Sequence, residues 1–510
     1  MSTTSLAGRI RRGAEEHAAV EVLFDGPAGV RESTVAELVE DAERVAGALR
    51  ARRVGPGDVV AVQAGSTYEG AVAQAAVALC GAVLLPIVLI YGPRELGFIL
   101  RQSAAVALVV PERARGRAHA APLLAALPRP AALRTVVVVG SPAGVDGAVA
   151  FEDLLAGGAP GAGPVRGGDD EALLVYTSGT TAEPKGVRHS HRTLLAELDS
   201  SPPDGSLRQL ALFPAGHVAG LLGLTRVLVH GVPTVVLEAW DPARAATLVD
   251  EHGLTYGVGA PVQLAGLLDE QARGTATLAS LTEFLTGAAN VPPALIRRAD
   301  AAGIPAYRCY GSSEHPTVSV GEPDDPLVKR AETDGRLLPG TEVRLVDDDG
   351  RDVPEGEIAT RGPELFLGYT DPALDRDAFL PGGWYRTGDV GRLDDDGFLT
   401  ITDRKKDIII RGGENISSKE VEDVLAEHPA VLDAAAIGYP DERLGERVCA
   451  VVVLAAGRTL HLDEVREHFA ASGLARQKTP ERLEVVEHLP RTPSGKVQKF
   501  TLRRQVNPRG

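Results

Sequence analysis

The residues best suited to chemistry form one short tract behind a run of apolar residues. Residues 173–176 are the apolar run, which predicts a buried strand. The tract behind it supplies hydroxyl groups, glycines and one lysine: Thr177, Ser178, Gly179, Thr180, Thr181 and Lys185. Hydroxyl donors, close backbone approach at glycine and a compact positive charge are what a polyphosphate needs. The tract therefore predicts a polyphosphate-binding loop, with a helix after it that Ser190 caps.

This loop is not the G-x-x-x-x-G-K-[ST] type, because glycine and valine follow Lys185. An ordinary polar surface loop is the competing interpretation. Four hydroxyl residues within five positions favour the phosphate interpretation.

Strands and helices alternate in the elements that must position this loop. The apolar patterns predict a helix over 34–50, strands over 58–62, 83–87 and 135–139, and a buried helix over 68–80. The same alternation continues to about residue 330 and includes a strand over 285–289. Such alternation is typical of doubly wound parallel sheets, so the fold class is α/β.

The pattern changes twice towards the end of the chain. Residues 331–404 contain short strands between Pro-Gly and Asp-Gly turns, which predicts a small antiparallel barrel or sheet. A boundary follows at 403–407, and 405–510 predicts a compact α+β unit. We therefore expect an N-terminal domain over 1–404 and a C-terminal domain over 405–510.

Composition excludes several classes of protein. The chain has 510 residues, a net charge of −16 and 44% hydrophobic residues, which fits an ordinary globular protein of two or more domains. The acidic balance argues against non-specific nucleic-acid binding. The three cysteines, Cys80, Cys309 and Cys449, have neither zinc-site nor disulfide spacing. No signal pattern or membrane span is predicted, so we expect a cytoplasmic protein.

Five motifs stand in fixed order along the chain. They are Y-T-S-G-T-T-A-E-P-K-G (176–186), Y-G-S-S-E (310–314), Y-R-T-G-D (385–389), D-R-K-K-D (403–407) with G-G-E-N-I (412–416), and P-S-G-K (493–496). Together they resemble the adenylate-forming superfamily, in particular its acyl-CoA synthetases for medium-chain, alicyclic or small acids. The resemblance covers nearly the whole chain. It implies a large N-terminal domain of doubly wound sheets with a small β-barrel, and a small mobile α+β C-terminal domain.

The resemblance implies an ATP-dependent carboxylic acid–CoA ligase that uses Mg²⁺. An acid and ATP give acyl-AMP and pyrophosphate, and the thiol of CoA then displaces AMP. Lys496 matches the family lysine that bridges the attacking carboxylate and the α-phosphate. Glu314 matches the Mg²⁺ ligand, a role that a hard oxygen donor suits.

The resemblance also assigns the nucleotide contacts. Tyr310 stacks on adenine, Asp389 accepts from the ribose hydroxyls, and Arg404 lies on the ribose or a phosphate. Backbone and hydroxyl contacts to the nucleotide are expected from Gly287, Gly311, Ser312 and Ser313.

His217 takes the family position that borders the acyl tunnel and can gate it, although a histidine of the core is the alternative. Amino-acid-activating relatives carry an aspartate near the position of Ala215, which holds the ammonium group of their substrate. This chain has alanine there, so an α-amino acid is not expected. The lining segments, 218–222, 257–260 and 315–317, are mostly small and apolar, which suits an aliphatic or alicyclic acid.

Lys406 matches the family hinge, about which the C-terminal domain rotates between an adenylating and a thioester-forming pose. In the second pose Gly412 and Gly413 are expected to line the pantetheine tunnel.

Two other functions stay open on the sequence. One is an acyl-AMP ligase that loads an acyl carrier protein instead of CoA, which the basic C-terminal tail could assist. The other is a nucleotide-binding regulator without catalysis. The acid itself is not encoded in any motif, and the chain could be a monomer or a homodimer.

Overall fold

The computed structural model describes residues 4–161, 163–164, 166–177, 184–200, 205–412, 414–492 and 495–507. The backbone divides into two compact units. Unit 1 contains Met1–Leu285, Gly311–Thr317 and Gly362–Asp377, and unit 2 contains Thr286–Tyr310, Val318–Arg361 and Ala378–Gly510. The predicted domain boundary at residue 404 divides the chain differently and stays a prediction.

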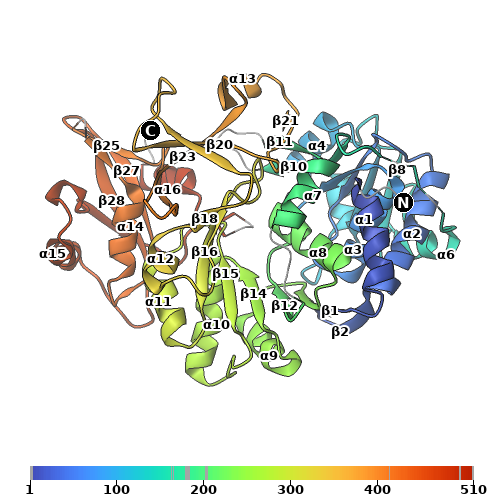
Figure 1. Cartoon of the computed structure of the whole chain (residues 1–510), viewed down its shortest axis with the longest axis horizontal. Coiled ribbons are helices and arrows are strands. Elements are labelled where there is room, and N and C mark those ends of the chain that lie inside the picture. The colour runs from blue at the N-terminus through green and yellow to red at the C-terminus, as the bar shows by residue number, and fades with distance from the viewer. Residues whose placement is uncertain are drawn as a thin grey trace. The chain divides into compact units, whose positions relative to one another are not determined.

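An eight-stranded sheet forms one layer of unit 1 (Figure 1). In spatial order its strands are β21 (Gly368–Tyr369), β11 (Lys185–Ser190), β10 (Glu171–Thr177), β4 (Val83–Pro86), β3 (Val59–Val62), β5 (Ala107–Pro111), β8 (Thr135–Val139) and β9 (Ala148–Ala150). The six strands from β10 to β9 pair in parallel, as the strand–helix alternation predicts. The edge strands β11 and β21 run antiparallel.

A second sheet in unit 1 contains β14 (Tyr256–Gly259), β12 (Gln209–Ala211), β13 (Thr234–Leu237), β1 (Glu21–Gly26) and β2 (Gly29–Thr34) in that order. All of its pairs are parallel except the hairpin of β1 with β2. Strand β15 (Glu283–Thr286) ends unit 1's first segment, and it is shorter than the predicted strand over 285–289. Ala288 has a φ of +64°, which is left-handed backbone that cannot continue a strand.

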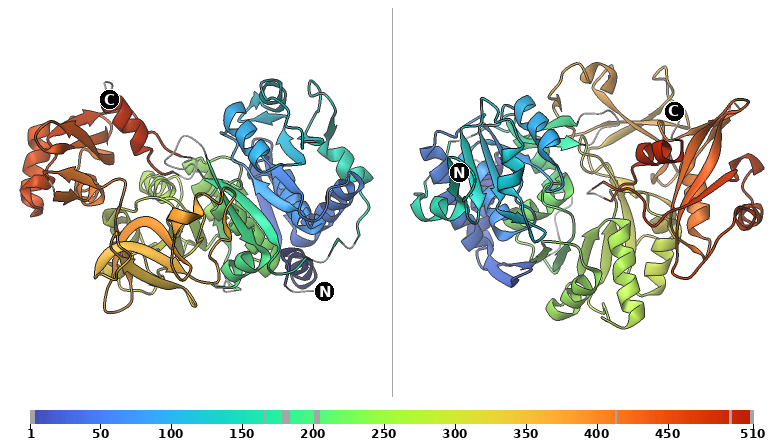
Figure 2. Two further views of the ribbon diagram at one scale, coloured as in Figure 1. Left: turned by 90° about the horizontal axis from the view of Figure 1, so that it is seen from above. Right: turned by 180° about the vertical axis from the view of Figure 1, so that it is seen from behind.

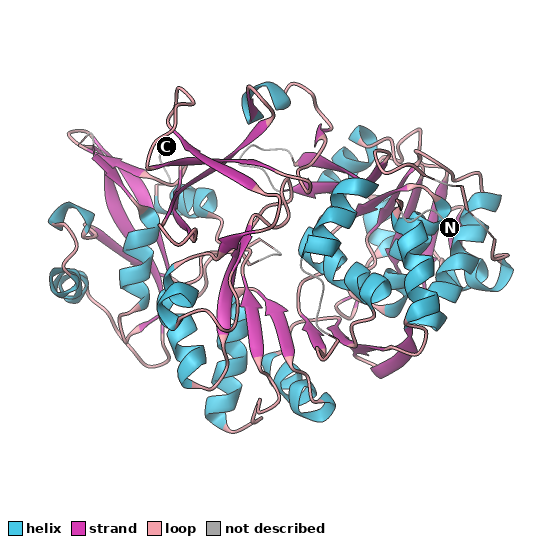
Figure 3. Ribbon diagram, viewed as in Figure 1, coloured by secondary structure: helices cyan, strands magenta, loops and turns pink. Residues whose placement is uncertain are grey.

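Helices pack on both sheets of unit 1 (Figure 3). They are α1 (Leu6–Glu16), α2 (Val35–Ala51), α3 (Tyr68–Cys80), α4 (Pro93–Gln102), α5 (Ala120–Ala125), α6 (Phe151–Gly157), α7 (His191–Ser200), α8 (Val218–His230), α9 (Pro242–His252) and α10 (Pro261–Arg273). Helix α2 begins at a capping box of Thr34 and Glu37, and the Ala-rich α3 is buried on every side, as a helix without a polar face must be.

Unit 2 begins with the antiparallel strands β16 (Ala306–Tyr310), β17 (Ser319–Val320) and β18 (Arg336–Leu337). A five-stranded antiparallel sheet follows, which the turn-rich sequence predicts: β19 (Glu342–Val346), β20 (Glu355–Arg361), β22 (Phe379–Leu380), β23 (Trp384–Leu393) and β24 (Leu399–Arg404). The helices of this part are α11 (Pro293–Ala301) and α12 (Leu327–Glu332). The single turn α13 (Asp375–Ala378) lies where the chain passes from unit 1 to unit 2.

The last hundred residues form a sheet that carries helices on both faces (Figure 2). Its strands are β25 (Ile409–Arg411), β26 (Glu414–Ile416), β27 (Val431–Asp441), β28 (Gly445–Leu454) and β29 (Arg482–Val485). Alternate residues of β27 and β28 pack against α14 (Ser418–Ala426) and α15 (Leu462–Ser472) on one face and against α16 (Lys499–Val506) on the other. Within the described part of the chain, no helix has both the length and the apolar composition needed to cross a membrane.

Candidate active site

A tight loop in unit 1 carries Glu314. The side-chain oxygen of Ser312 accepts hydrogen bonds from the backbone N–H groups of Glu314 and His315, both at 3.2 Å. At Gly311 a β-carbon would lie 1.9 Å from the carbonyl oxygen of Pro316, so only glycine fits there. Ser312 thus holds its own loop in shape.

His189 supports this loop from a fully buried position on β11. Its Nε2 lies 2.7 Å from the carbonyl oxygen of Ser313 and therefore donates, while Nδ1 lies 3.1 Å from the hydroxyl of Thr193. Burial lowers the pKa of His189, so the ring is neutral. The sequence interpretation did not include His189, because nothing in the chain near it points to a loop more than a hundred residues away.

Glu314 meets two other residues of unit 1. The hydroxyl of Tyr369 donates to Glu314 Oε1 at 2.8 Å, and Lys185 Nζ lies 5.3 Å from the centre of the Tyr369 ring. Phe366 N–H donates to the Glu314 carbonyl at 2.9 Å. The structure therefore brings together two predicted residues, Lys185 and Glu314, through a tyrosine that lies in none of the five motifs.

The predicted phosphate loop joins two paired strands. Thr177 at the end of β10 lies opposite Lys185 at the start of β11. The predicted contacts Ser178, Gly179, Thr180 and Thr181 lie outside the described residues. The expectation that a helix follows is confirmed: Thr193 N–H donates to the Ser190 hydroxyl at 3.2 Å at the start of α7.

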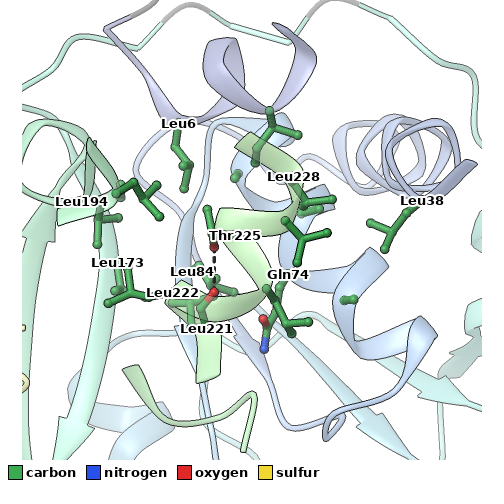
Figure 4. Close-up of a pocket in the computed structure, with 18 of the residues that line it drawn as sticks. Leu6, Leu38, Gln74, Leu84, Leu173, Leu194, Leu221, Leu222, Thr225 and Leu228 are labelled. Carbon is green, nitrogen blue, oxygen red and sulfur yellow. Dashed lines mark hydrogen bonds between the residues drawn. The ribbon is translucent and has the colours of Figure 1, made fainter. Parts of the chain in front are cut away.

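His217 caps the first turn of α8. Its Nδ1 accepts from Ala219 N–H at 3.3 Å, and its ring stacks on Phe213 with the ring centres 6.2 Å apart. Leu221 and Leu222, from the predicted acyl-pocket segment, line a cavity of about 30 Å³ in the core of unit 1 (Figure 4). In that cavity Thr225 donates to the carbonyl of Leu221 at 2.8 Å. A cavity of this size holds no more than a few water molecules, so it has no room for an acid.

The second group of site residues lies in unit 2, where Asp389 is central. The hydroxyl of Tyr310 donates to Asp389 Oδ2 at 2.9 Å, and Arg404 Nε donates to Asp389 Oδ1. Asp389 is only 5% exposed. Burial and then the Asp389 charge raise the pKa of Tyr310, and that charge raises the pKa of Arg404. A carboxylate, a cation and an aromatic ring are thus held together on β16, β23 and β24.

Two further predicted positions are explained by close packing or turn geometry. A β-carbon at Gly287 would lie 2.5 Å from Cys309 Sγ, so the backbone approaches as only glycine allows. Gly412 has a φ of +63° and donates to the carbonyl of Leu444 at 2.7 Å. Gly413 lies outside the described residues.

Lys406 is the second residue after the end of β24. Its carbonyl oxygen accepts from Arg503 at 3.4 Å. Burial lowers the pKa of the Lys406 ammonium, and the nearby Arg404 charge lowers it further.

Lys496 lies three residues before α16 and forms two hydrogen bonds with Thr492. Thr492 N–H donates to the Lys496 carbonyl at 2.7 Å, and Lys496 N–H donates to the Thr492 hydroxyl at 3.1 Å. Gly495 has a φ of +86°, which favours glycine. The position of Lys496 is therefore fixed through its backbone.

Family models match most of the chain. The model for "AMP-binding enzyme" matches residues 10–370, and that for "AMP-binding enzyme C-terminal domain" matches residues 420–496.

Curated proteins and solved structures are similar over nearly the full length. A medium-chain fatty-acid–CoA ligase of Escherichia coli (strain K12) is 36% identical over 93% of this chain and 86% of its own. A 3-[(3aS,4S,7aS)-7a-methyl-1,5-dioxo-octahydro-1H-inden-4-yl]propanoyl:CoA ligase of Rhodococcus jostii (strain RHA1) is 34% identical over 98% and 99%. The crystal structure of the anthranilate CoA ligase AuaEII with anthranoyl-AMP superimposes with a TM-score of 0.89 at 26% identity, covering 99% of this chain and 97% of that one.

Proposed function

The chain belongs to the AMP-binding enzyme family, and on that premise we propose how its residues share the work of an ATP-dependent carboxylic acid–CoA ligase. In the first half-reaction, an oxygen of the acid attacks the α-phosphorus of ATP and the bond to pyrophosphate breaks. In the second, the CoA sulfur attacks the acyl carbon, the bond to AMP breaks, and the thiol proton is released. Both reactants of the first step are anions, so the protein must supply positive charge and hydrogen-bond donors.

We assign nucleotide binding to Tyr310, Asp389 and Arg404, and this cluster is the observation that carries the proposal. The Asp389 carboxylate is an acceptor that suits ribose hydroxyls, and its hydrogen bonds to Tyr310 and Arg404 fix its orientation. The hydrogen bond between Tyr310 and Asp389 also orients the Tyr310 ring for adenine. Gly287, Gly311, Ser312 and Ser313 complete the nucleotide contacts.

We assign the β- and γ-phosphates to Lys185 with Thr177, and Mg²⁺ to Glu314. The fit rests on the donor set: Glu314 is one carboxylate whose Oε1 is held by the Tyr369 hydroxyl at 2.8 Å, and Mg²⁺ takes one or two carboxylates together with phosphates and water. When bound, the ion supplies charge neutralisation at the phosphates. Tyr369 and His189 position the Glu314 loop from behind.

We propose that the acid is aliphatic or alicyclic and that His217 borders its channel. The relatives that act on medium-chain and fused-ring acids support this class, as does the absence of an acidic side chain at Ala215, which is buried. A pyrophosphate-release screen across short, medium, branched, alicyclic and aromatic acids tests it. A preference for α-amino or aromatic acids would contradict it.

We assign the transfer step itself to Lys496, which would bridge the carboxylate and the α-phosphate. Lys496→Ala should slow ATP–pyrophosphate exchange by about 100-fold or more, because a charge aimed at the transition state is lost. Thioester formation from supplied acyl-AMP should change by less than about threefold, since that step needs no new bond to phosphorus. Lys478→Ala, a lysine of the same α+β unit, is the control. Equal loss of both half-reactions would refute the role of Lys496.

An acyl carrier protein is the second candidate acceptor, and the basic α16, with Arg503 and Arg504 in its last turn, is the feature that favours it. Turnover with free CoA, compared with turnover on a phosphopantetheinylated carrier protein, separates the two. We expect CoA to be the better acceptor.

A further inference from the structure

Three residues after Lys496, a second lysine has a largely buried side chain that binds other residues of the protein. Lys499 is the first residue of α16, and its side chain is 13% exposed. Its Nζ lies 2.6 Å from Glu422 Oε1 and donates to the hydroxyl of Ser418 at 2.7 Å, both residues being on α14.

The bond to Ser418 continues to the end of β24. The Ser418 hydroxyl donates to Asp403 Oδ1 at 3.1 Å, and Ser418 N–H donates to Asp403 Oδ2 at 2.8 Å. Ser418 is 1% exposed and Asp403 7%. Lys499 therefore ties α16 to α14 and, through one hydroxyl, to the strand that directly precedes the predicted hinge at Lys406.

The buried acids of this network depend on Lys499. Burial raises the pKa of both Glu422 and Asp403, and in each case the Lys499 charge opposes the rise. Glu422 Oε1 also accepts from Ala436 N–H at 2.9 Å, which joins β27 to the network. Removing the cation leaves two buried carboxyl groups without their counter-charge, a costly arrangement.

The backbone on both sides of Lys496 is fixed by further contacts. On the α16 side, Gln498 N–H donates to the carbonyl of Pro490 at 2.7 Å, and Val497 forms a bridge with Arg491. On the other side, the Arg491 guanidinium contacts the carbonyl of Gly495 and lies 2.5 Å from Asp433 Oδ2. A shift of the first turn of α16 would therefore move Lys496.

We propose that Lys499 is a positioning residue for Lys496: by binding Glu422 and Ser418 it fixes the first turn of α16, and with it the backbone of Lys496. The proposal rests on the role given to Lys496 under the proposed function. Lys499 itself is assigned no contact with substrates, because its ammonium group is bound to Glu422 and Ser418 on α14.

The test separates the two half-reactions in Lys499→Met, which keeps the aliphatic stem and removes the charge. ATP–pyrophosphate exchange should fall by about 10- to 100-fold, since a displacement near 1 Å costs that much. Thioester formation from supplied acyl-AMP should stay within about threefold of wild type, and Lys499→Arg, which restores a cation, should recover most of the exchange rate.

The matched control is Lys478→Met, because Lys478 also pairs with α14, at 2.5 Å from Glu420, but does not touch α16. It should leave both half-reactions unchanged. Loss of both half-reactions in Lys499→Met, loss of neither, or no recovery in Lys499→Arg would overturn the proposal.

Ser418→Ala carries the test if Lys499→Met does not fold. It removes one hydroxyl and leaves the pair of Lys499 with Glu422, so exchange should fall by about three- to tenfold with thioester formation unchanged. Unchanged exchange would overturn the proposal. Lys496→Ala in the same assays distinguishes failure of this inference from failure of the proposed function. If Lys496→Ala retains ATP–pyrophosphate exchange, the proposed role of Lys496 is wrong. If Lys496→Ala loses exchange while Lys499→Met keeps the wild-type rate, only this inference is refuted.

Discussion

Asp389 is the single residue on which most of the nucleotide assignment depends. Its two oxygens serve different partners, since Oδ2 accepts from Tyr310 and Oδ1 from Arg404. Thr387 adds a third bond, because its hydroxyl accepts from Asp389 N–H at 3.1 Å. Hydrogen bonds and ion pairs of a buried charged group stabilise the structure more than an ion pair on the surface does.

Asp389→Asn should raise the KM for ATP by about tenfold or more, because hydrogen bonds to a charged group are lost and the Arg404 charge loses its partner. The KM for the acid should change much less. Asp352→Asn, a surface aspartate paired with Arg344, is the control. An unchanged KM for ATP together with a lower melting temperature would show that Asp389 serves only the fold.

Helix α7 and the segment in front of β21 meet at a pair of buried acids. Glu197 is 4% exposed and accepts from the hydroxyl of Thr317 at 3.1 Å, with an Arg226 nitrogen at 3.6 Å. Glu364 is fully buried, and burial followed by the Glu197 charge raises its pKa to about 10. Glu364 is therefore protonated at neutral pH. The pair joins α7 to the end of the Glu314 loop.

Glu364→Gln should stabilise the protein increasingly as the pH rises from 5 to 9. The folded state keeps the Glu364 proton above pH 4.5 whereas the unfolded state releases it, so wild type loses stability through this range up to about pH 10. Glutamine has no proton to lose. The melting temperature should gain on the order of a few degrees at pH 8. Glu355→Gln, at an exposed position, should give no pH-dependent gain in melting temperature. A difference in melting temperature between Glu364→Gln and wild type that stays constant with pH would contradict the assignment.

At the scale of the whole molecule, the two half-reactions are expected to need two poses of the C-terminal part. The residues around Lys406 are tied on both sides: Asp403 holds α14 through Ser418, and Arg503 of α16 contacts the Lys406 carbonyl. A rotation at this position would have to break bonds between Asp403 and Ser418. These bonds therefore belong to one pose only, if the hinge lies at Lys406.

Lys406→Pro tests that hinge, because proline fixes φ near −65°. Exchange should stay within about threefold of wild type, while CoA transfer falls by more than about tenfold, as for a hinge that gates one step. Asp395→Pro is the matched control, since Asp395 is the second residue of the turn closed by Gly397 N–H and the Asp394 carbonyl, where proline is tolerated. A parallel fall of both rates would refute the hinge.

The sequence alone determined the elements whose signals are local. Alternating strands and helices give the parallel sheet, the capping box at Thr34 starts α2, and Thr135–Val139 is a strand with the predicted bounds. The motifs determined the family for the same reason, because each consists of neighbours in the chain. Strand β11 was not predicted, since K-G-V-R-H-S has no apolar run and its strand form depends on pairing with β10 and β21.

Only the tertiary structure decided which distant residues support the site. Tyr369 reaches Glu314 from 55 positions away, and His189 reaches the carbonyl of Ser313 from 124 positions away. The motif singled out Lys496, but nothing in the sequence indicated what Lys499 does, three residues later in the same basic tail. The contacts of Lys499 with Glu422 and Ser418 are a property of packing between elements, which no local pattern encodes.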